Sequence, residues 1–182
     1  MPRHQAPRFC YASVMWNFNG QQRPDFAIEP ADGQESVWDY PRPPAIVDCD
    51  RLVVVAAGPT AIARSNRAVR ILETASPPTI YLPPEDVDFA CLTEVPGSSF
   101  CEWKGMANYY ALAAGARAIA WQYRAPLRAF AAITDYLCFY PGRVDCTLDG
   151  ERVEPQAGDF YGGWVTADIV GPFKGDLGTG NW

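Results

Sequence analysis

Residues 51–65 read RLVVVAAGPTAIARS, and residues 67–87 read RAVRILETASPPTIYLPPEDV. The first stretch contains a β-branched run that ends at Gly58 and Pro59, and TAIARS then predicts the returning strand of a hairpin. In the second stretch, AVRILET and TIYLP predict another strand pair. The break between them, residues 75–78, holds two prolines, which cost no ladder hydrogen bonds when they lie in a loop. Two successive hairpins indicate a mainly β fold.

The pattern of short strands continues toward the C-terminus. KGMANYYALAAG (104–115) and ARAIAWQYRAP (116–126) predict a long central hairpin that turns around Gly115. Further short strands are expected in CFY (138–140), VDCTL (144–148) and ERVEP (151–155), the last two joined by a tight Asp149-Gly150 turn. Only LRAFAAITDYL (127–137) has the apolar spacing of a helix, so we expect one short helix.

A chain of 182 residues is long enough for one ordinary domain and too short for two independent ones. Residues 1–50 are rich in proline and large aromatic side chains, which predicts an irregular arm that docks by burying Trp38 and Tyr40. Residues 51–155 hold the predicted strands and form the expected core. Residues 156–182 carry many glycines, which predicts a segment that wraps the core and anchors through Trp164, Phe173 and Trp182.

The charge and hydropathy of the chain exclude several classes of protein. With 15 Lys and Arg against 21 Asp and Glu the net charge is −6, so phosphate backbones and anionic lipids repel the chain. We expect no nucleic-acid partner and no membrane association. No window reaches roughly 18 uninterrupted apolar residues, and no apolar run follows the N-terminus as an export signal requires. A cytoplasmic protein is therefore expected.

The cysteines and the single histidine restrict the chemistry. No Cys-x-x-Cys pair occurs among the six cysteines, so we expect reduced thiols, no metal site and no cofactor. The one histidine is His4, in the N-terminal tail. Any catalysis must therefore depend on Cys, Lys, Glu and Tyr side chains.

Those residue types are densest in FCEWKGMANYY, residues 100–110. Cys101 precedes Lys104 by three positions, and a nearby ammonium group favours the thiolate, so Cys101 is a candidate nucleophile or redox thiol. Glu73, on a neighbouring predicted strand, is a candidate acid or base. The same sequence also fits a Cys101 that packs in the core beneath Trp103.

Aromatic side chains on the predicted central hairpin can line a ligand pocket. Tyr109 lies on its first strand, and Trp121 and Tyr123 share one face of its second strand. A concave face that combines these rings with Lys104 and Glu73 suits a small polar or aromatic ligand. Cross-strand aromatic packing in a plain core is the alternative that the same spacing allows.

Four blocks of sequence occur in one order along the chain. They are RAVRILETASPPTIYLPPEDV (67–87), FCEWKGMANYY (100–110), AWQYRAP (120–126) and FYPGRVD (139–145). This succession resembles a bacterial family catalogued as domain of unknown function 427, which also carries a nucleotidyltransferase label. The flanking QESVWDYPRPP (34–44) and GGWVTADIVGPFKG (162–175) are similar to extended members, so the resemblance runs from about Gln34 to Trp182.

The resemblance implies a fold and a set of positions. The fold is a mainly β domain of the Mss4-like, or β-tent, type, in which two antiparallel sheets meet along one edge and leave a cleft between them. Zinc-bearing relatives of that fold use Cys-x-x-Cys pairs, which this chain lacks. The positions that match the family's blocks are Arg70, Glu73, Tyr81, Cys101, Trp103, Lys104, Gly105 and Tyr109.

Three functions remain open, and the leading hypothesis is a small-molecule-binding domain, with or without catalysis. Its pocket is built from Glu73, Tyr81, Cys101, Lys104, Tyr109 and Trp121, with Arg70 and Trp103 as further ligand contacts. The second hypothesis is a non-enzymatic module for interaction or self-association, such as a homodimer. The third is metal-dependent nucleotidyl transfer by Asp48 and Asp50.

Overall fold

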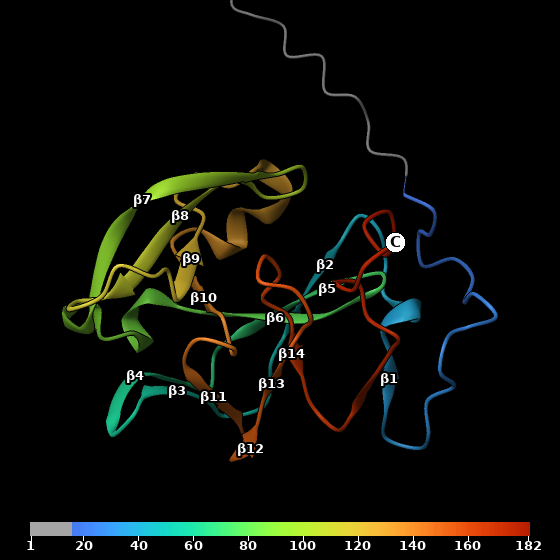
Figure 1. Cartoon of the computed structure of the whole chain (residues 1–182), viewed down its shortest axis with the longest axis horizontal. Helices are drawn as coiled ribbons and strands as arrows, with labels where there is room; N and C mark the ends of the chain where they lie inside the picture. Colours follow the sequence, from blue (N-terminus) through green and yellow to red (C-terminus); the bar gives the residue numbers. More distant parts are fainter. Residues whose placement is uncertain (1–15) are drawn as a thin grey trace, which may run out of the picture.

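The computed structural model describes residues 16–182, which form one large and one smaller antiparallel sheet (Figure 1). The large sheet has seven strands in the order β2-β5-β6-β10-β9-β8-β7. They are β2 (Ala45–Asp48), β5 (Val69–Glu73), β6 (Ser76–Leu82), β10 (Leu137–Phe139), β9 (Ala120–Gln122), β8 (Gly105–Leu112) and β7 (Leu92–Cys101). Each neighbouring pair is antiparallel. The mainly β fold expected from the sequence is confirmed.

The smaller sheet has four strands in the order β12-β11-β3-β4, again antiparallel. They are β12 (Glu151–Arg152), β11 (Asp145–Leu148), β3 (Val53–Ala57) and β4 (Thr60–Ser65). Two short pairs tie the ends of the chain to this body. They are β1 (Glu35–Ser36) with β15 (Ile169–Val170), which is parallel, and β13 (Glu154–Pro155) with β14 (Trp164–Val165), which is antiparallel.

The helical elements of the described residues are four short 3-10 segments. They are η1 (Val37–Asp39), η2 (Pro84–Asp86), η3 (Phe89–Cys91) and η4 (Arg128–Ile133). None of the helices in residues 16–182 has the length and apolar character needed to cross a membrane.

The predicted hairpins are present. β3 pairs with β4, β5 pairs with β6, and β8 pairs with β9. The turn between β11 and β12 is Asp149-Gly150, with φ angles of 51° and 83°. Positive φ at both central residues matches the twist of the flanking strands, which is why this dipeptide signals a tight hairpin turn.

The short helix predicted within residues 127–137 is present, as a 3-10 helix that covers only part of that segment. The structure forms only the 3-10 segment η4, which is kinked at Phe130, where φ is −113° and ψ is 17°. Asp135 then adopts a φ of 62°, and Leu137 begins strand β10. The apolar spacing reflects side chains that face the core from a turn, because Phe130, Ile133 and Leu137 are all buried.

Two strand predictions also need correction. Pro77 and Pro78 lie inside β6 instead of in a loop, opposite a shift in the β5–β6 register between Ile71 and Glu73. The missing amide donors therefore fall at an irregularity of the ladder. β7, the longest strand, has no counterpart among the predicted elements, and its partner register shifts between residues 95 and 98.

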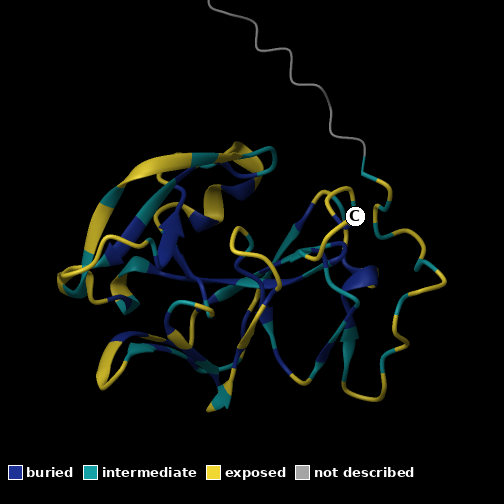
Figure 2. Cartoon of the chain, viewed as in Figure 1, coloured by how far each residue is buried: buried dark blue, intermediate teal, exposed yellow. Residues whose placement is uncertain are grey.

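The main core lies between the sheets, and the C-terminal segment contributes to it. Trp164 is 1% exposed and donates its indole N–H to the Phe139 carbonyl at 3.0 Å. Trp38 and Tyr40 are buried and anchor the arm as predicted, in a cluster that Phe173 and Trp182 also join. Figure 2 shows buried residues along β9 and β10 and exposed residues along the outer edge at β7.

The two ends of the described chain lie side by side, since the Asn17 amide donates to the Asn181 carbonyl at 2.9 Å. Strand β2 belongs to the large sheet although it falls within the expected arm, and β14 and β15 fall within the expected wrap. The division at residues 50 and 155 stays a prediction, as does the β-tent class. His4 lies outside the described residues.

Candidate functional site

A pocket of about 770 Å³ opens between the end of the β7–β8 hairpin, strands β5 and β6, and the C-terminal segment. We call it the main pocket. Of the eight site residues predicted from the sequence, it brings together seven, namely Glu73, Tyr81, Cys101, Trp103, Lys104, Tyr109 and Trp121. A role for these seven in binding or catalysis stays a prediction, but their proximity in space is a property of the fold.

Arg70 does not reach the main pocket. Its guanidinium donates to the Glu35 carboxylate, with Nη1 to Oε1 at 3.0 Å, and this partner lowers the pKa of Glu35. Successive side chains of a strand point to opposite faces. Because Ile71 and Glu73 of β5 line the main pocket, Arg70 faces away from it and borders a smaller cavity instead.

Aromatic rings of the large sheet form one wall of the main pocket. The Trp121 indole N–H donates to the Tyr81 hydroxyl at 3.0 Å, and the Trp121 ring lies 4.5 Å from that of Tyr140. The Tyr109 hydroxyl donates to Ser99 Oγ at 2.7 Å. Tyr81 is fully buried, and this burial raises its pKa well above the usual value. These contacts hold the rings in fixed positions and keep the Tyr81 phenol protonated.

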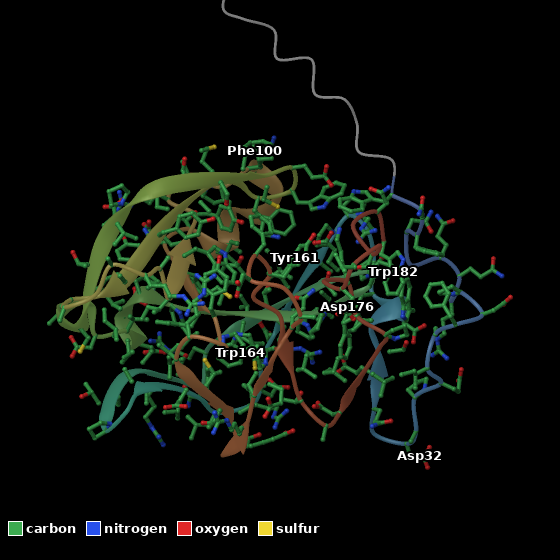
Figure 3. All side chains as sticks on the ribbon, viewed as in Figure 1. Asp32, Phe100, Tyr161, Trp164, Asp176 and Trp182 are labelled. Carbon is green, nitrogen blue, oxygen red and sulfur yellow. The ribbon has the colours of Figure 1, made fainter. Side chains whose placement is uncertain are left out.

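The C-terminal segment forms a second wall and packs directly on the first. A Cβ atom at Gly162 would lie 2.3 Å from Cη2 of Trp121, so only glycine allows the main chain to lie against the ring. The following residue, Gly163, donates its amide to Oε1 of Gln156 at 3.0 Å. Figure 3 shows Tyr161 on this segment near the middle of the molecule and Phe100 at its outer edge, and both border the pocket.

Lys104 places a buried cation in the pocket. It directly precedes β8, and its carbonyl accepts the Leu127 amide at 3.0 Å, which fixes its main chain. The residue is 8% exposed, and its Nζ lies 5.7 Å from the centre of the Phe130 ring. Lys104 Nζ forms no ion pair or hydrogen bond with another described residue. The ammonium group is therefore buried without a counter-ion in the described part of the chain.

Next to Lys104, Trp103 carries a second unpartnered donor. Its indole N–H is buried and has no acceptor among residues 16–182. Buried donors are usually satisfied, because desolvation without a hydrogen bond costs free energy. The turn between β7 and β8 thus carries two buried polar groups that have no hydrogen-bond partner among the described residues.

Lys174 is a second buried cation in the pocket, and the sequence reasoning missed it. The residue is 4% exposed, and its Nζ lies 3.7 Å from the centre of the Trp16 ring and 5.6 Å from that of Tyr161. Burial lowers the pKa of Lys174 to about 8. A signal was available, because the chain contains only two lysines, and both line this pocket.

The two pocket carboxylates are engaged by the arm. Glu73 pairs with the Arg42 guanidinium at 3.3 Å, and Glu102 accepts the Trp16 indole N–H at 2.7 Å. Arg42 also lies over the Trp16 ring, 4.4 Å from its centre. These contacts close one end of the pocket with residues from the N-terminal arm.

Cys101 lies in the pocket beside Tyr123. Burial first, and then the Cys101 thiol, raise the pKa of Tyr123. Lys104 and Cys101 both line the pocket, and their side chains form no hydrogen bond with each other. Activation of Cys101 by Lys104 therefore stays a prediction without a direct contact behind it.

Asp48 and Asp50 lie apart from the main pocket. Both are exposed and border a cavity of about 200 Å³ with Arg51, Arg70 and Asp168. Across the described residues, no group of three or more His, Cys, Asp and Glu side chains is arranged to hold a metal ion. The geometry therefore lends no support to metal-dependent nucleotidyl transfer at this place.

A comparison with family models identifies the family of the chain. A family model described as a domain of unknown function matches residues 45–150, which is more than half of the chain. No curated protein matches the chain. Six residues of the main pocket lie outside the matched range, namely Trp16, Gln156, Phe160, Tyr161, Gly162 and Lys174. The resemblance seen in the sequence blocks is confirmed, and the chain belongs to the family described as domain of unknown function 427 (DUF427).

Proposed function

We propose that the protein binds a small organic anion with an aromatic or apolar body in the main pocket. The observation that carries this proposal is the Lys104 ammonium group, which is 8% exposed and has no ion-pair partner among the described residues. Lysine is seldom buried without a partner, because removing an unpaired charge from water is costly. An anionic group on a ligand would supply the missing partner.

The neighbours of Lys104 favour the same class of ligand. The Trp103 indole N–H, in the same turn, is buried and also has no acceptor among the described residues. The pocket's own carboxylates do not neutralise Lys104, because Glu73 pairs with Arg42 and Glu102 accepts from Trp16. The Lys104 ammonium group is therefore left without a carboxylate partner inside the pocket, so a ligand anion can pair with it.

The volume and the lining of the pocket indicate the size and the apolar or aromatic character of the proposed ligand. A volume of about 770 Å³ lies within the range of pockets that enclose small organic molecules. The rings of Tyr81, Tyr109, Trp121 and Tyr140 offer flat apolar surface for stacking. Self-association and a catalytic role for Cys101 and Glu73 stay predictions beside this proposal.

Calorimetric titration with 2-naphthoate and its neutral analogue 2-naphthylmethanol tests the proposal. We expect the anion to bind more tightly, and Lys104→Met to weaken naphthoate binding by about tenfold to a hundredfold, the effect of one charged hydrogen bond. Lys104→Arg should keep part of the affinity because it keeps the charge. Arg128→Met is the matched control, since Arg128 is exposed and does not line the pocket.

Two results would contradict the proposal. Equal affinity for the anion and the alcohol would show that charge plays no part in recognition. Unchanged naphthoate affinity in a folded Lys104→Met variant would remove Lys104 from the site.

A further inference from the structure

The distribution of lysine in this chain is unusual. Of the fifteen basic residues only two are lysines, and the other thirteen are arginines. Both lysines are more than nine-tenths buried, and both line the main pocket. Lysine elsewhere is among the residues least often buried. Every side-chain amine in the protein is therefore placed in one cavity, while arginine supplies all other positive charge.

Arginine and lysine differ in what they can do chemically. A guanidinium stays protonated at any ordinary pH and does not act as a nucleophile. The lysine amine can lose its proton when it is desolvated, and the neutral amine attacks carbonyl carbon. Two amines in one pocket, in a chain that otherwise uses arginine, point to a role that needs the amine itself.

The main chain of Lys174 is fixed by two short hydrogen bonds, whereas its side-chain amine forms only one long hydrogen bond. Its amide donates to the Ala75 carbonyl at 2.7 Å, and its own carbonyl accepts Nε2 of Gln156 at 2.5 Å. Its Nζ lies over the Trp16 and Tyr161 rings, and its one hydrogen bond, to the main-chain oxygen of Trp182, is long at 3.5 Å. Lys174 forms no ion pair with an Asp or Glu side chain among the described residues.

The groups that face Lys174 set its protonation. Glu73 on β5 and Glu102 after β7 favour the charged form, whereas Arg42 of the arm disfavours it, and Tyr161 lies over the amine from the C-terminal segment. Burial is the largest influence and lowers the pKa of Lys174 to about 8. A useful fraction of neutral amine is therefore present near neutral pH.

We propose that Lys174 forms an imine with the carbonyl carbon of an aldehyde or ketone bound in the main pocket. The proposal rests on the proposed function, because the same pocket must admit the ligand. The amine lone pair attacks the carbonyl carbon, and the carbonyl π electrons pass to oxygen. Transfer of a proton from nitrogen to oxygen gives the carbinolamine, and loss of one water gives the imine.

The rest of the pocket is suited to this step. The Glu73 and Glu102 carboxylates border the same cavity and can carry the proton between nitrogen and oxygen. Lys104 supplies the fixed positive charge for an anionic group of the same ligand. The ligand class is thus an oxo-acid with an aromatic or apolar body.

The test uses 4-carboxybenzaldehyde as the probe and borohydride to reduce the imine to a stable amine. The full-length protein is incubated with the aldehyde and quenched at timed intervals, and the adduct is located by peptide mass spectrometry. Of the two lysines, we expect Lys174 to form its adduct at least tenfold faster than Lys104; an adduct at the α-amino group, which is also reactive near neutral pH, maps to a different peptide. Lys174→Met and Lys174→Arg should lose the Lys174 adduct, and Arg128→Met should keep the wild-type rate.

The pH dependence of labelling gives a second readout. The initial rate at Lys174 should rise with pH up to about 8 and then level off, because the amine is largely neutral above its pKa. An ordinary exposed lysine would continue to gain reactivity up to about pH 10.4. A rate that keeps rising through pH 10 would contradict the assignment of a desolvated, reactive amine.

The outcomes separate the two proposals. If 2-naphthoate binds but no adduct forms at Lys174, or Lys104 is labelled as fast, the imine proposal fails and the anion site stands. If Lys174 is labelled while naphthoate does not bind, the anion proposal fails together with the oxo-acid ligand class, and only imine formation at Lys174 stands. If Lys174→Met still binds naphthoate, the variant is folded. Locating the adduct in the wild-type protein by peptide mass spectrometry does not depend on any variant.

Discussion

Among the cysteines of the described residues, Cys101 is the one that lines the main pocket. Cys138 and Cys146 are buried in the core, and burial raises the pKa of both thiols. Cys91 lies outside the pocket beside Asp88, which raises its pKa. Among the described cysteines, Cys101 is therefore the one whose reactivity should respond to the proposed ligand.

We expect iodoacetamide to label Cys101 much faster than the two core thiols at neutral pH. Adding 2-naphthoate at about ten times its Kd should slow labelling of Cys101 by about tenfold, because only the unoccupied protein reacts. Cys91 is the internal control and should react at the same rate with and without the ligand. Peptide mass spectrometry measures each site, and equal protection of Cys91 and Cys101 would show that the effect does not arise in the pocket.

At the scale of single residues, the sequence located much of the site through local density. FCEWKGMANYY holds Cys101, Lys104 and Tyr109 within ten positions, and the structure places them in one pocket. Arg70 could have been excluded from the predicted pocket, because it lies an odd number of positions from Glu73 and side chains at such spacings point to opposite faces of a strand. Lys174 was out of reach of local density, since it lies seventy positions from Lys104 and meets it only through the fold.

At the scale of elements, the hairpins with strong patterns could be predicted and the edge of the sheet could not. β3 carries a β-branched run, and a Gly-Pro turn joins it to the returning strand β4, so local chemistry determines this hairpin. β7 contains Pro96 and Gly97 and exposes most of its residues, so it lacks both the alternation and the propensity of a strand. Its ten residues become a strand because β8 offers a pairing edge, which is a tertiary effect.

The N-terminal arm is fixed to the sheet mainly through Arg42. The Arg42 side chain is 3% exposed, and its guanidinium donates to the carbonyls of Phe18 at 2.8 Å and Thr74 at 2.7 Å, besides pairing with Glu73. One side chain thus joins two parts of the arm to β5 and to the pocket. Its loss leaves two carbonyls and one carboxylate without their donor.

We expect Arg42→Ala to lower the free energy of unfolding by about 3 kcal/mol, the cost of removing one partner of a buried charged network. Hydrogen exchange should quicken at the amides of Thr74 and Ala75, which donate to arm carbonyls. Arg152→Ala is the matched control, because its side chain is 77% exposed and its ion pair with Asp145 is 3.8 Å long. The control should cost less than about 0.5 kcal/mol in urea titration, and an Arg42 variant with an equally small cost would rule out this anchoring role.

At the scale of the whole molecule, the main pocket is formed partly by the family-matched range and partly by the segments before and after it. Residues 45–150 include all seven strands of the large sheet, yet the pocket walls also need Trp16 from the arm and Lys174 from the C-terminal segment. The ends hold each other, since the rings of Phe26 and Trp182 stack 5.1 Å apart. The shape of the main pocket therefore depends on segments that lie outside the matched range.

The C-terminal segment also belongs to the core, which leads to a prediction for its removal. Trp164 fills the space between the sheets, and replacing a buried tryptophan by alanine costs about 3 to 5 kcal/mol. A whole domain is stable by only about 5 to 15 kcal/mol. Removing residues 156–182 takes away Trp164, the β14 and β15 pairings and the second pocket wall together, so we expect the shortened chain to lose cooperative unfolding.

Circular dichroism and urea titration measure this outcome, with two point variants to divide the effect. Trp164→Ala should remain folded but lose about 3 to 5 kcal/mol of stability, whereas Leu177→Ala, at a fully exposed position of the same segment, should unfold like the wild-type protein. A shortened chain that unfolds cooperatively at the wild-type urea midpoint would mean that residues 156–182 lie on a core that is already complete. The expected loss would instead mean that the same segment forms a wall of the main pocket and holds the two sheets together.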